Sequence, residues 1–170
     1  MRSLYVIRHG EPALKGVMLG RVDPPLSEAG REAARAALSD LQVDLVYASP
    51  LRRARETAAF INAPCRIVDD LAEMAYGDWE GLAWAEIEGR WPDLVARKMA
   101  DWWAVTPPGG ETREQVAVRA ARALDVIRQG PFPAAVVAHG GLNAELLWQA
   151  SGRDPLRITQ AYCEIIAITL

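Results

Sequence analysis

The chain has 170 residues, of which 51% are hydrophobic and 24% charged, and its net charge is -3. This length and apolar content exclude intrinsic disorder and predict a single domain over residues 1–170 that needs neither a metal nor disulfides to fold. The slight excess of acids argues against a nucleic-acid or polybasic membrane-surface protein, and no apolar run approaches the ~20 residues of a membrane-spanning helix.

The first third of the chain alternates between strand and helix patterns. A buried strand is expected over 3–7, followed by an alanine-rich helix over 27–38 that its first serine caps. A second strand is expected over 43–47. The next helix is expected to start with Ser49 as N-cap and Pro50 in the first helical position.

A short strand is expected over 66–68, and the region that follows it has a different composition. Residues 77–110 contain five of the six tryptophans and a Pro-Pro-Gly-Gly turn. We expect this region to form a helical cap insertion over the carboxyl ends of the strands. Its tryptophans are expected mainly to pack the cap, with one or two lining a substrate pocket as the alternative.

The last third returns to alternating helices and strands. Thr112 and Gln115 have the spacing of a capping box at the start of a helix. A strand over 134–138, a helix over 142–150 and a final strand over 163–170 complete the pattern. Strands separated by helices predict a three-layer α/β/α sandwich with a mostly parallel sheet.

The two cysteines, Cys65 and Cys163, lie far apart in the chain and form no CxxC pair. We interpret them as buried, reduced thiols of a cytoplasmic protein, with a bridge between them as the less favoured alternative. The apolar run at the N-terminus is too short for a signal peptide. Phosphate-loop, dinucleotide and zinc motifs are all lacking, so no cofactor and no metal are expected.

Both histidines of the chain occur in the same context. His9 and His139 each follow a predicted buried strand and precede glycine. Ligands bind at the carboxyl ends of strands in open α/β sheets, so the two imidazoles are expected to converge there if their strands are neighbours. A metal site, with Glu11 or Glu145 as third ligand, is the less favoured alternative.

Two arginines are expected beside these histidines. Arg8 directly continues a buried strand, where a cation needs an anionic partner. Arg52 is expected in the first turn of a helix, where free N–H groups favour an anion and a guanidinium can grip two phosphate oxygens. Arg53 and Arg55 are assigned to the solvated face of that helix.

The ordered set of motifs resembles the histidine phosphatase superfamily, also called phosphoglycerate mutase-like. The resemblance covers the chain from Leu4 to about Gln149. Within the superfamily, the chain looks most similar to the α-ribazole phosphatases and related small phosphatases. The matching segments are Arg8-His9-Gly10-Glu11, Leu26-Ser27-Glu28-Ala29-Gly30, Ala48 to Ala58, Leu71-Ala72-Glu73, Gly77-Asp78-Trp79-Glu80-Gly81, Pro108 to Thr112 and His139-Gly140.

This resemblance implies roles for individual residues. His9 would be the nucleophile that forms a phosphohistidine, and Glu73 would donate a proton to the leaving group. The residues that would hold the phosphoryl oxygens are Arg8, Arg52 and His139. Those assigned to substrate contacts are Gly140 and Glu111. The rival acids in the same loops are Glu11, Glu80 and Glu111.

The sequence departs from the family pattern at two positions after the first motif. Pro12 stands where threonine or serine is common, and Lys15 stands where many members have asparagine. The catalytic set is intact, so the departures bear on details of phosphate and substrate contact.

The function expected from the sequence is therefore metal-independent hydrolysis of a small phosphomonoester through phosphohistidine, by a monomer or homodimer. α-Ribazole 5'-phosphate is one candidate substrate. The alternatives are a phosphoryl-transferring mutase, a protein phosphatase of the same superfamily and a phosphate-binding module without turnover.

Overall fold

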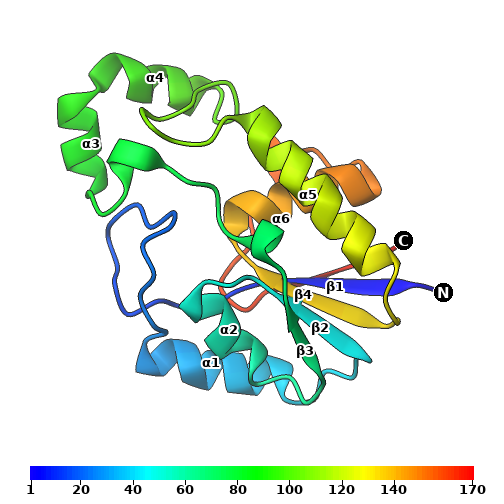
Figure 1. The fold of residues 1–170 in the computed structure, drawn as a ribbon. Helices are drawn as coiled ribbons and strands as arrows, with labels where there is room; N and C mark the ends of the chain where they lie inside the picture. The colour runs from blue at the N-terminus through cyan, green and yellow to red at the C-terminus, as the bar shows by residue number, and fades with distance from the viewer.

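The computed structural model describes all 170 residues and is built around one five-stranded sheet (Figure 1). Its strands are β1 (Ser3–Arg8), β2 (Leu45–Ala48), β3 (Cys65–Ile67), β4 (Ala134–Ala138) and β5 (Ile165–Thr169). They lie in the order β3-β2-β4-β1-β5, and only β5 runs antiparallel to its neighbour. The mostly parallel sheet expected from the sequence is thus confirmed.

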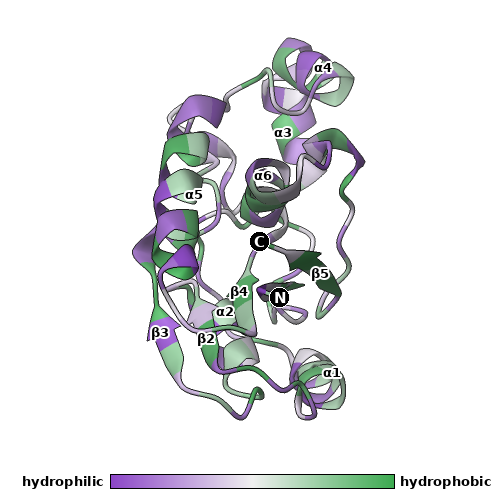
Figure 2. Ribbon diagram, turned by 90° about the vertical axis from the view of Figure 1, so that its right-hand side faces the viewer, coloured by the Kyte–Doolittle hydropathy of each residue, from purple (hydrophilic) through white to green (hydrophobic).

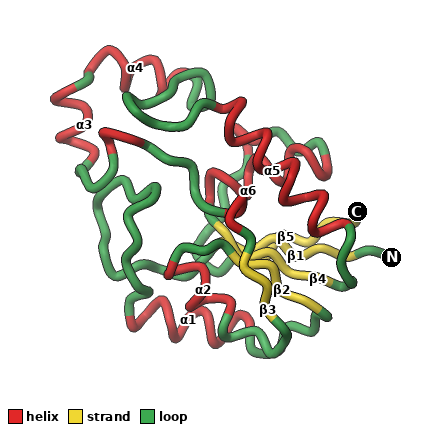
Figure 3. Tube along the Cα trace, in the orientation of Figure 1, coloured by secondary structure: helices red, strands yellow, loops and turns green.

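Helices cover both faces of this sheet, as the tube in Figure 3 also shows. One face carries α1 (Glu28–Leu38) and α2 (Arg52–Ala58), and the other carries α5 (Arg113–Arg128) and α6 (Gly140–Ser151). Three short 3-10 helices span Asp69–Leu71, Gly77–Trp79 and Pro155–Arg157. None of the helices combines the length and apolarity needed to cross a bilayer.

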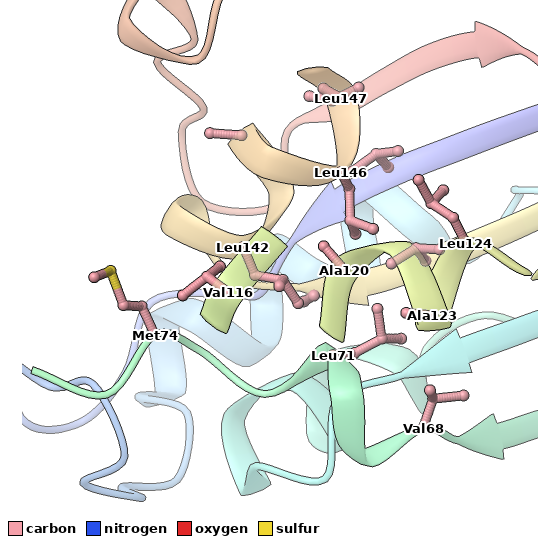
Figure 4. Packing of buried hydrophobic residues seen from close by; sticks show 14 of the residues in the cluster. Val68, Leu71, Met74, Val116, Ala120, Ala123, Leu124, Leu142, Leu146 and Leu147 are labelled. Atoms are coloured by element: carbon pink, nitrogen blue, oxygen red, sulfur yellow. The ribbon is translucent and has the colours of Figure 1, made fainter. Parts of the chain in front are cut away.

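Two apolar cores lie on the two faces of the sheet. The larger core packs α5 and α6 onto it, with Val116, Leu124, Leu142 and Leu146 in contact range (Figure 4). The smaller core lies under α1 and α2. Hydrophobic and hydrophilic residues alternate along α5, so one side faces the core and the other faces solvent (Figure 2). Every residue of β4 is buried, because this strand lies in the middle of the sheet.

The helix boundaries mostly agree with their expected caps. Ser27 caps α1 by accepting a hydrogen bond from Gly30, and Thr112 and Gln115 form the capping box of α5. The prediction for Ser49 is wrong, because α2 begins only at Arg52 and its N-cap residue has no capping side chain. The Ser49 hydroxyl instead contacts a histidine of the site described below.

The helical cap consists of α3 (Trp84–Arg90) and α4 (Pro92–Ala100), which lie beyond the carboxyl ends of the parallel strands. Trp79 is fully buried and packs edge-on against Trp84, so cap packing is confirmed for these rings. The two chain ends lie at the opposite end of the sheet (Figure 1), where the Leu170 amide donates to the Arg2 carbonyl over 3.0 Å.

Both cysteines are free, but only one of them is buried. Cys163 is shielded from solvent, as expected. Cys65 is exposed, so the expectation of a buried thiol is wrong there. The reason is its position in β3, an edge strand of three residues whose side chains all face solvent.

Candidate active site

The two histidines meet at the carboxyl edge of the sheet. Their strands, β1 and β4, are parallel neighbours in which Arg8 pairs with Ala138, so His9 and His139 are the next residues of each. Their ring centroids lie 5.0 Å apart. Only 4% of His9 and none of His139 is exposed. The parallel register thus brings together two side chains that are 130 positions apart in the chain.

Hydrogen bonds fix the tautomer of His9. Its Nδ1 lies 2.7 Å from the Gly10 carbonyl, which can only accept, so Nδ1 carries the proton. The Arg53 Nε–H, which can only donate, points at Nε2 over 3.3 Å. Burial lowers the pKa of His9 to about 3, and the Arg53 and Arg8 charges act in the same direction. His9 is therefore neutral at pH 7, with a lone pair on Nε2.

His139 presents a donor to the same region. Its Nε2 lies 2.7 Å from the Ser49 hydroxyl. That hydroxyl accepts from the Leu51 amide, and Nε2 is the one acceptor that it contacts, so the hydroxyl proton is assigned to Nε2. Nδ1 then carries the ring proton, and this buried atom has no partner in the protein. Burial holds the pKa of His139 well below its usual value, so this donor belongs to a neutral ring.

The Arg8 guanidinium has one nitrogen that is hydrogen-bonded within the protein and one that is not. Its Nη1 donates to the Gln160 carbonyl over 2.7 Å, while its buried Nε has no partner. The guanidinium lies 4.3 Å from the centroid of the Tyr162 ring. A Cβ on Gly140 would lie 3.6 Å from Nε, at ordinary van der Waals distance, so this glycine lies next to the guanidinium.

The structure corrects the choice of arginine on α2. The Arg52 side chain is 56% exposed and donates to Glu56 over 2.7 Å, away from the histidines. Arg53 is 1% exposed and contacts His9. The carbonyls of Val22 and Gly20 accept from its guanidinium over 2.8 and 2.9 Å. The predictions for both residues are wrong, because α2 starts at residue 52 and its turn directs residue 53 inward.

A sequence signal for Arg53 exists in the helix periodicity. Ala54, Thr57 and Ala58 are small residues that share the buried face of α2 with Arg53. Thr57 lies one turn after Arg53 on the same face and accepts from the Gly10 amide over 2.9 Å. Charged residues flank this narrow face in the sequence, and for that reason the segment has the pattern of a solvent-exposed helix.

Glu73 is held at the start of α6. Its carboxylate accepts from the amides of Met74, Gly141 and Leu142 at 2.8 to 3.2 Å, and the residue is 8% exposed. Arg21 and Arg119 donate to its backbone carbonyl. A Cβ on Gly141 would lie 2.8 Å from Glu73 Oε1, so only glycine allows the carboxylate to lie there without a shift.

The other candidate acids have structural partners. Arg119 donates to both oxygens of Glu111, at 2.8 and 2.9 Å, and the Ala75 amide donates to one of them. Although burial raises it, these bonds lower the pKa of Glu111 overall. Glu111 thus braces the loop that carries Glu73, and its contact with substrate stays a prediction. Glu80 accepts from two backbone amides of neighbouring loops.

Glu11 is directed to the surface. It accepts from the Ser27 hydroxyl and pairs with Lys15, each at 2.8 Å. Lys15, one of the two departures from the family pattern, thereby contacts a loop carboxylate. No group of three His, Cys, Asp or Glu side chains has an arrangement that could hold a metal ion. The alternative of a two-histidine metal site therefore lacks its third ligand.

Tyr162 is a site residue that the sequence analysis missed. Its ring centroid lies 5.6 Å from that of His9, and the ring also contacts Arg8. The next residue, Cys163, has a φ of 61° and donates from its amide to the Arg8 carbonyl. This rarely populated backbone conformation turns the chain over the site. The sequence around Tyr162 gives no sign of this role, since a lone tyrosine before a strand is unremarkable.

The family model of the histidine phosphatase superfamily, branch 1, matches residues 4–170. The chain belongs to the histidine phosphatase superfamily. It is 33% identical over 167 residues to the uncharacterized phosphatase PhoE of Bacillus subtilis, covering 91% of this chain and 80% of that protein. It is 36% identical to glucosyl-3-phosphoglycerate phosphatase of Mycobacterium tuberculosis, covering 85% and 73%.

Solved structures of two phosphatases share the fold. The native structure of a mycobacterial glucosyl-3-phosphoglycerate phosphatase superposes with a TM-score of 0.86 at 30% identity, covering 98% of this chain and 89% of that one. The α-ribazole phosphatase of Shigella flexneri gives a TM-score of 0.79 at 28% identity, covering 93% and 86%. The resemblance expected from the sequence motifs is thus confirmed at the level of the superfamily.

Proposed function

We propose that this histidine phosphatase is a metal-independent phosphomonoesterase that hydrolyses a small phosphorylated metabolite through a phosphohistidine. The observation that carries the proposal is an unprotonated Nε2 on a neutral His9 beside two buried donors without partners, Arg8 Nε and His139 Nδ1. Unpartnered buried donors are rare, and a phosphoryl group supplies the acceptors they lack. The related phosphatases named above support the same reaction type.

The first step transfers the phosphoryl group to the enzyme. His9 Nε2 forms a bond to phosphorus while the ester P–O bond breaks, and protonated Glu73 gives its proton to the departing alkoxide. Arg8, Arg53 and His139 donate to the non-bridging oxygens. Each charge-assisted hydrogen bond contributes about 1.5–3 kcal/mol, and more where charge develops in the transition state.

The second step regenerates the enzyme. The Glu73 carboxylate takes a proton from water, which attacks phosphorus as the P–N bond breaks. Inorganic phosphate leaves, and His9 returns to its neutral form. The Gly10 carbonyl accepts from Nδ1–H throughout, which keeps the attacking nitrogen turned toward the phosphoryl group.

Two substrates follow from the related proteins, α-ribazole 5'-phosphate and glucosyl-3-phosphoglycerate. A mutase shares the first step and differs in returning the phosphoryl group to an organic acceptor. A screen of metabolite monoesters that includes both substrates, with release of inorganic phosphate as readout, distinguishes hydrolysis from transfer. A protein phosphatase would prefer phosphopeptides in the same screen, and a binding module would release nothing.

The nucleophile is tested with a ³²P-labelled aryl phosphate and rapid quenching. The wild type should form an acid-labile, base-stable phosphoenzyme, as expected for an N–P bond. His9→Ala should form none and lose about 10⁴-fold or more in kcat, with an unchanged circular dichroism spectrum. Full phosphoenzyme formation by the variant would contradict the assignment. A chelator should leave the wild-type rate unchanged.

Glu73 is tested through the leaving group. Glu73→Gln should reduce the hydrolysis of alkyl phosphates much more than that of p-nitrophenyl phosphate, whose leaving group needs no proton. Equal losses on both esters would place the acid elsewhere. Glu111→Gln is the matched control, because Glu111 braces the same loop and is predicted to change both rates equally.

A further inference from the structure

A pocket of about 280 Å³ borders the start of α6, and most of the residues that line it are hydrophobic; we call it the apolar pocket. Its walls come from three parts of the chain that are distant in sequence, and they are formed by Tyr76, Trp102, Trp103, Pro155, Leu156 and Ile158. Gly140 and Gly141, the first residues of α6, also line it. The pocket thus lies between the cap, the start of α6 and the loop before β5.

The two glycines connect this pocket to the reacting groups. A Cβ on Gly140 would lie 3.6 Å from Arg8 Nε, and one on Gly141 would lie 2.8 Å from Glu73 Oε1. Arg8 and Glu73 therefore lie next to the two glycines that line the pocket. Because Glu73 protonates the leaving alkoxide in the proposed reaction, the alcohol part of the substrate extends from the phosphoryl site on the Glu73 side.

No charged side chain lines the pocket. Lys98 lies 4.3 Å from the Trp102 ring centroid, but it is fully buried and its ammonium donates to the carbonyls of Trp102 and Val105. A carboxylate or second phosphate entering the pocket would lose water without meeting a charged partner among the lining side chains. Such a transfer is unfavourable, whereas an uncharged ring would bury apolar area against the tryptophans.

We propose that this pocket binds an uncharged, aromatic or otherwise apolar part of the leaving group, and that it rejects substrates with a second anionic group there. The proposal rests on the phosphomonoesterase function and specifies its substrate class. The volume suits one or two rings, since pockets for larger organic ligands begin at about 300 Å³. Of the two substrates named above, α-ribazole 5'-phosphate belongs to this substrate class. Glucosyl-3-phosphoglycerate does not, because its glycerate part carries a carboxylate.

Two synthetic esters with the same alkyl leaving group test the selectivity. In 3-phenylpropyl phosphate the propyl chain ends in a ring, and in 3-carboxypropyl phosphate it ends in a carboxylate. The wild type should prefer the phenyl ester by about 10-fold or more in kcat/KM, mainly through KM. Equal kcat/KM values, or a preference for the carboxylate, would overturn the pocket assignment while leaving the phosphatase function intact.

A charge placed in the pocket should reduce this preference. Leu156 is 57% exposed, so Leu156→Lys should fold, and it should raise kcat/KM for the carboxypropyl ester at least 5-fold relative to the phenyl ester. Val118→Lys is the matched control, because Val118 is equally exposed but lies on α5 outside the pocket. An unchanged ester ratio in Leu156→Lys, or the same shift in both variants, would contradict the proposal.

A binding measurement distinguishes failure of the pocket proposal from failure of the proposed phosphatase function. Calorimetric titration of the His9→Ala variant with both esters measures affinity without turnover. Tighter binding of the phenyl ester would support the pocket even if neither ester were hydrolysed, in which case the proposed phosphatase function alone would fail. Equal affinities would overturn the pocket assignment whatever the rates.

Discussion

The phosphoryl site and the apolar pocket differ in how the chain builds them. The phosphoryl site takes His9 and His139 from the ends of two paired strands, so the hydrogen bonds of the sheet fix their separation. The pocket takes its walls from the cap and from the loop before β5, which no sheet register constrains. We infer that the chemistry depends on the sheet and that selectivity depends on the loops.

The largest test of this division compares two neighbouring arginines. Arg53→Lys should lower kcat/KM for every phosphomonoester by about 10³-fold, because lysine cannot reproduce the buried planar fork beside His9. Arg52→Lys should stay within about 2-fold, because its side chain faces solvent. Equal losses would mean that α2 presents both residues to the phosphoryl group. Thermal unfolding of each variant checks that the fold survives.

Gly141 belongs to both regions, so its substitution tests where they join. Gly141→Ala should displace the Glu73 carboxylate and lower kcat for alkyl phosphates by about 10²-fold. Gly89→Ala, in the open on helix α3, should keep full activity and raise the stability by about 1 kcal/mol. Wild-type activity in Gly141→Ala would show that Glu73 can retract without consequence.

The burial of His9 predicts that the free energy of unfolding depends on pH, whereas the pocket, which no charged side chain lines, makes no such contribution. The unfolded chain protonates His9 near pH 6.5, while the folded protein resists protonation down to about pH 3. Stability is therefore lost as the pH falls through this window, by about 2 kcal/mol between pH 8 and pH 5 from this residue. Urea unfolding of the wild type and His9→Gln at both pH values measures it. Identical pH dependence in both proteins would contradict the assignment.

Tyr162 gives the smallest expected effect. Tyr162→Leu should raise KM about 5-fold to 10-fold, because Arg8 loses the ring on which its guanidinium stacks. Tyr162→Phe should keep a wild-type KM, since the ring rather than the hydroxyl makes the contact. A similar loss in both variants would instead assign the role to the hydroxyl.

The sheet could be predicted from the sequence because its strands are buried apolar runs between helices. β4 has the predicted bounds, and the positions of both histidines after neighbouring strands follow from the same pattern. The first residue of α2 was harder to predict, since Ser49 and Pro50 together have the pattern of a helix N-terminus. Tertiary context overrides it, because the Ser49 hydroxyl contacts His139. The helix start moved by two residues, and that displacement changed which arginine lies inside.

Other features of the site depend on contacts between segments that no local pattern reveals. The ring of Tyr162 lies against Arg8 only because the chain turns at Cys163. The partners of Glu111 come from α5 and from the Glu73 loop, which makes a loop carboxylate into a brace. The pocket combines residues 76, 102 and 156, whose proximity depends on where the cap lies.

The hydrogen bond between Leu170 and Arg2 has a practical consequence for engineering. The chain starts and finishes at adjacent points, about one strand length of 20 Å from His9. A short flexible linker could join these points, and new ends could be opened in the exposed turn at residues 39–40. Such a circular permutant should keep its catalytic rate, and fluorophores or surface anchors attached near residues 1 and 170 should not obstruct entry of the substrate.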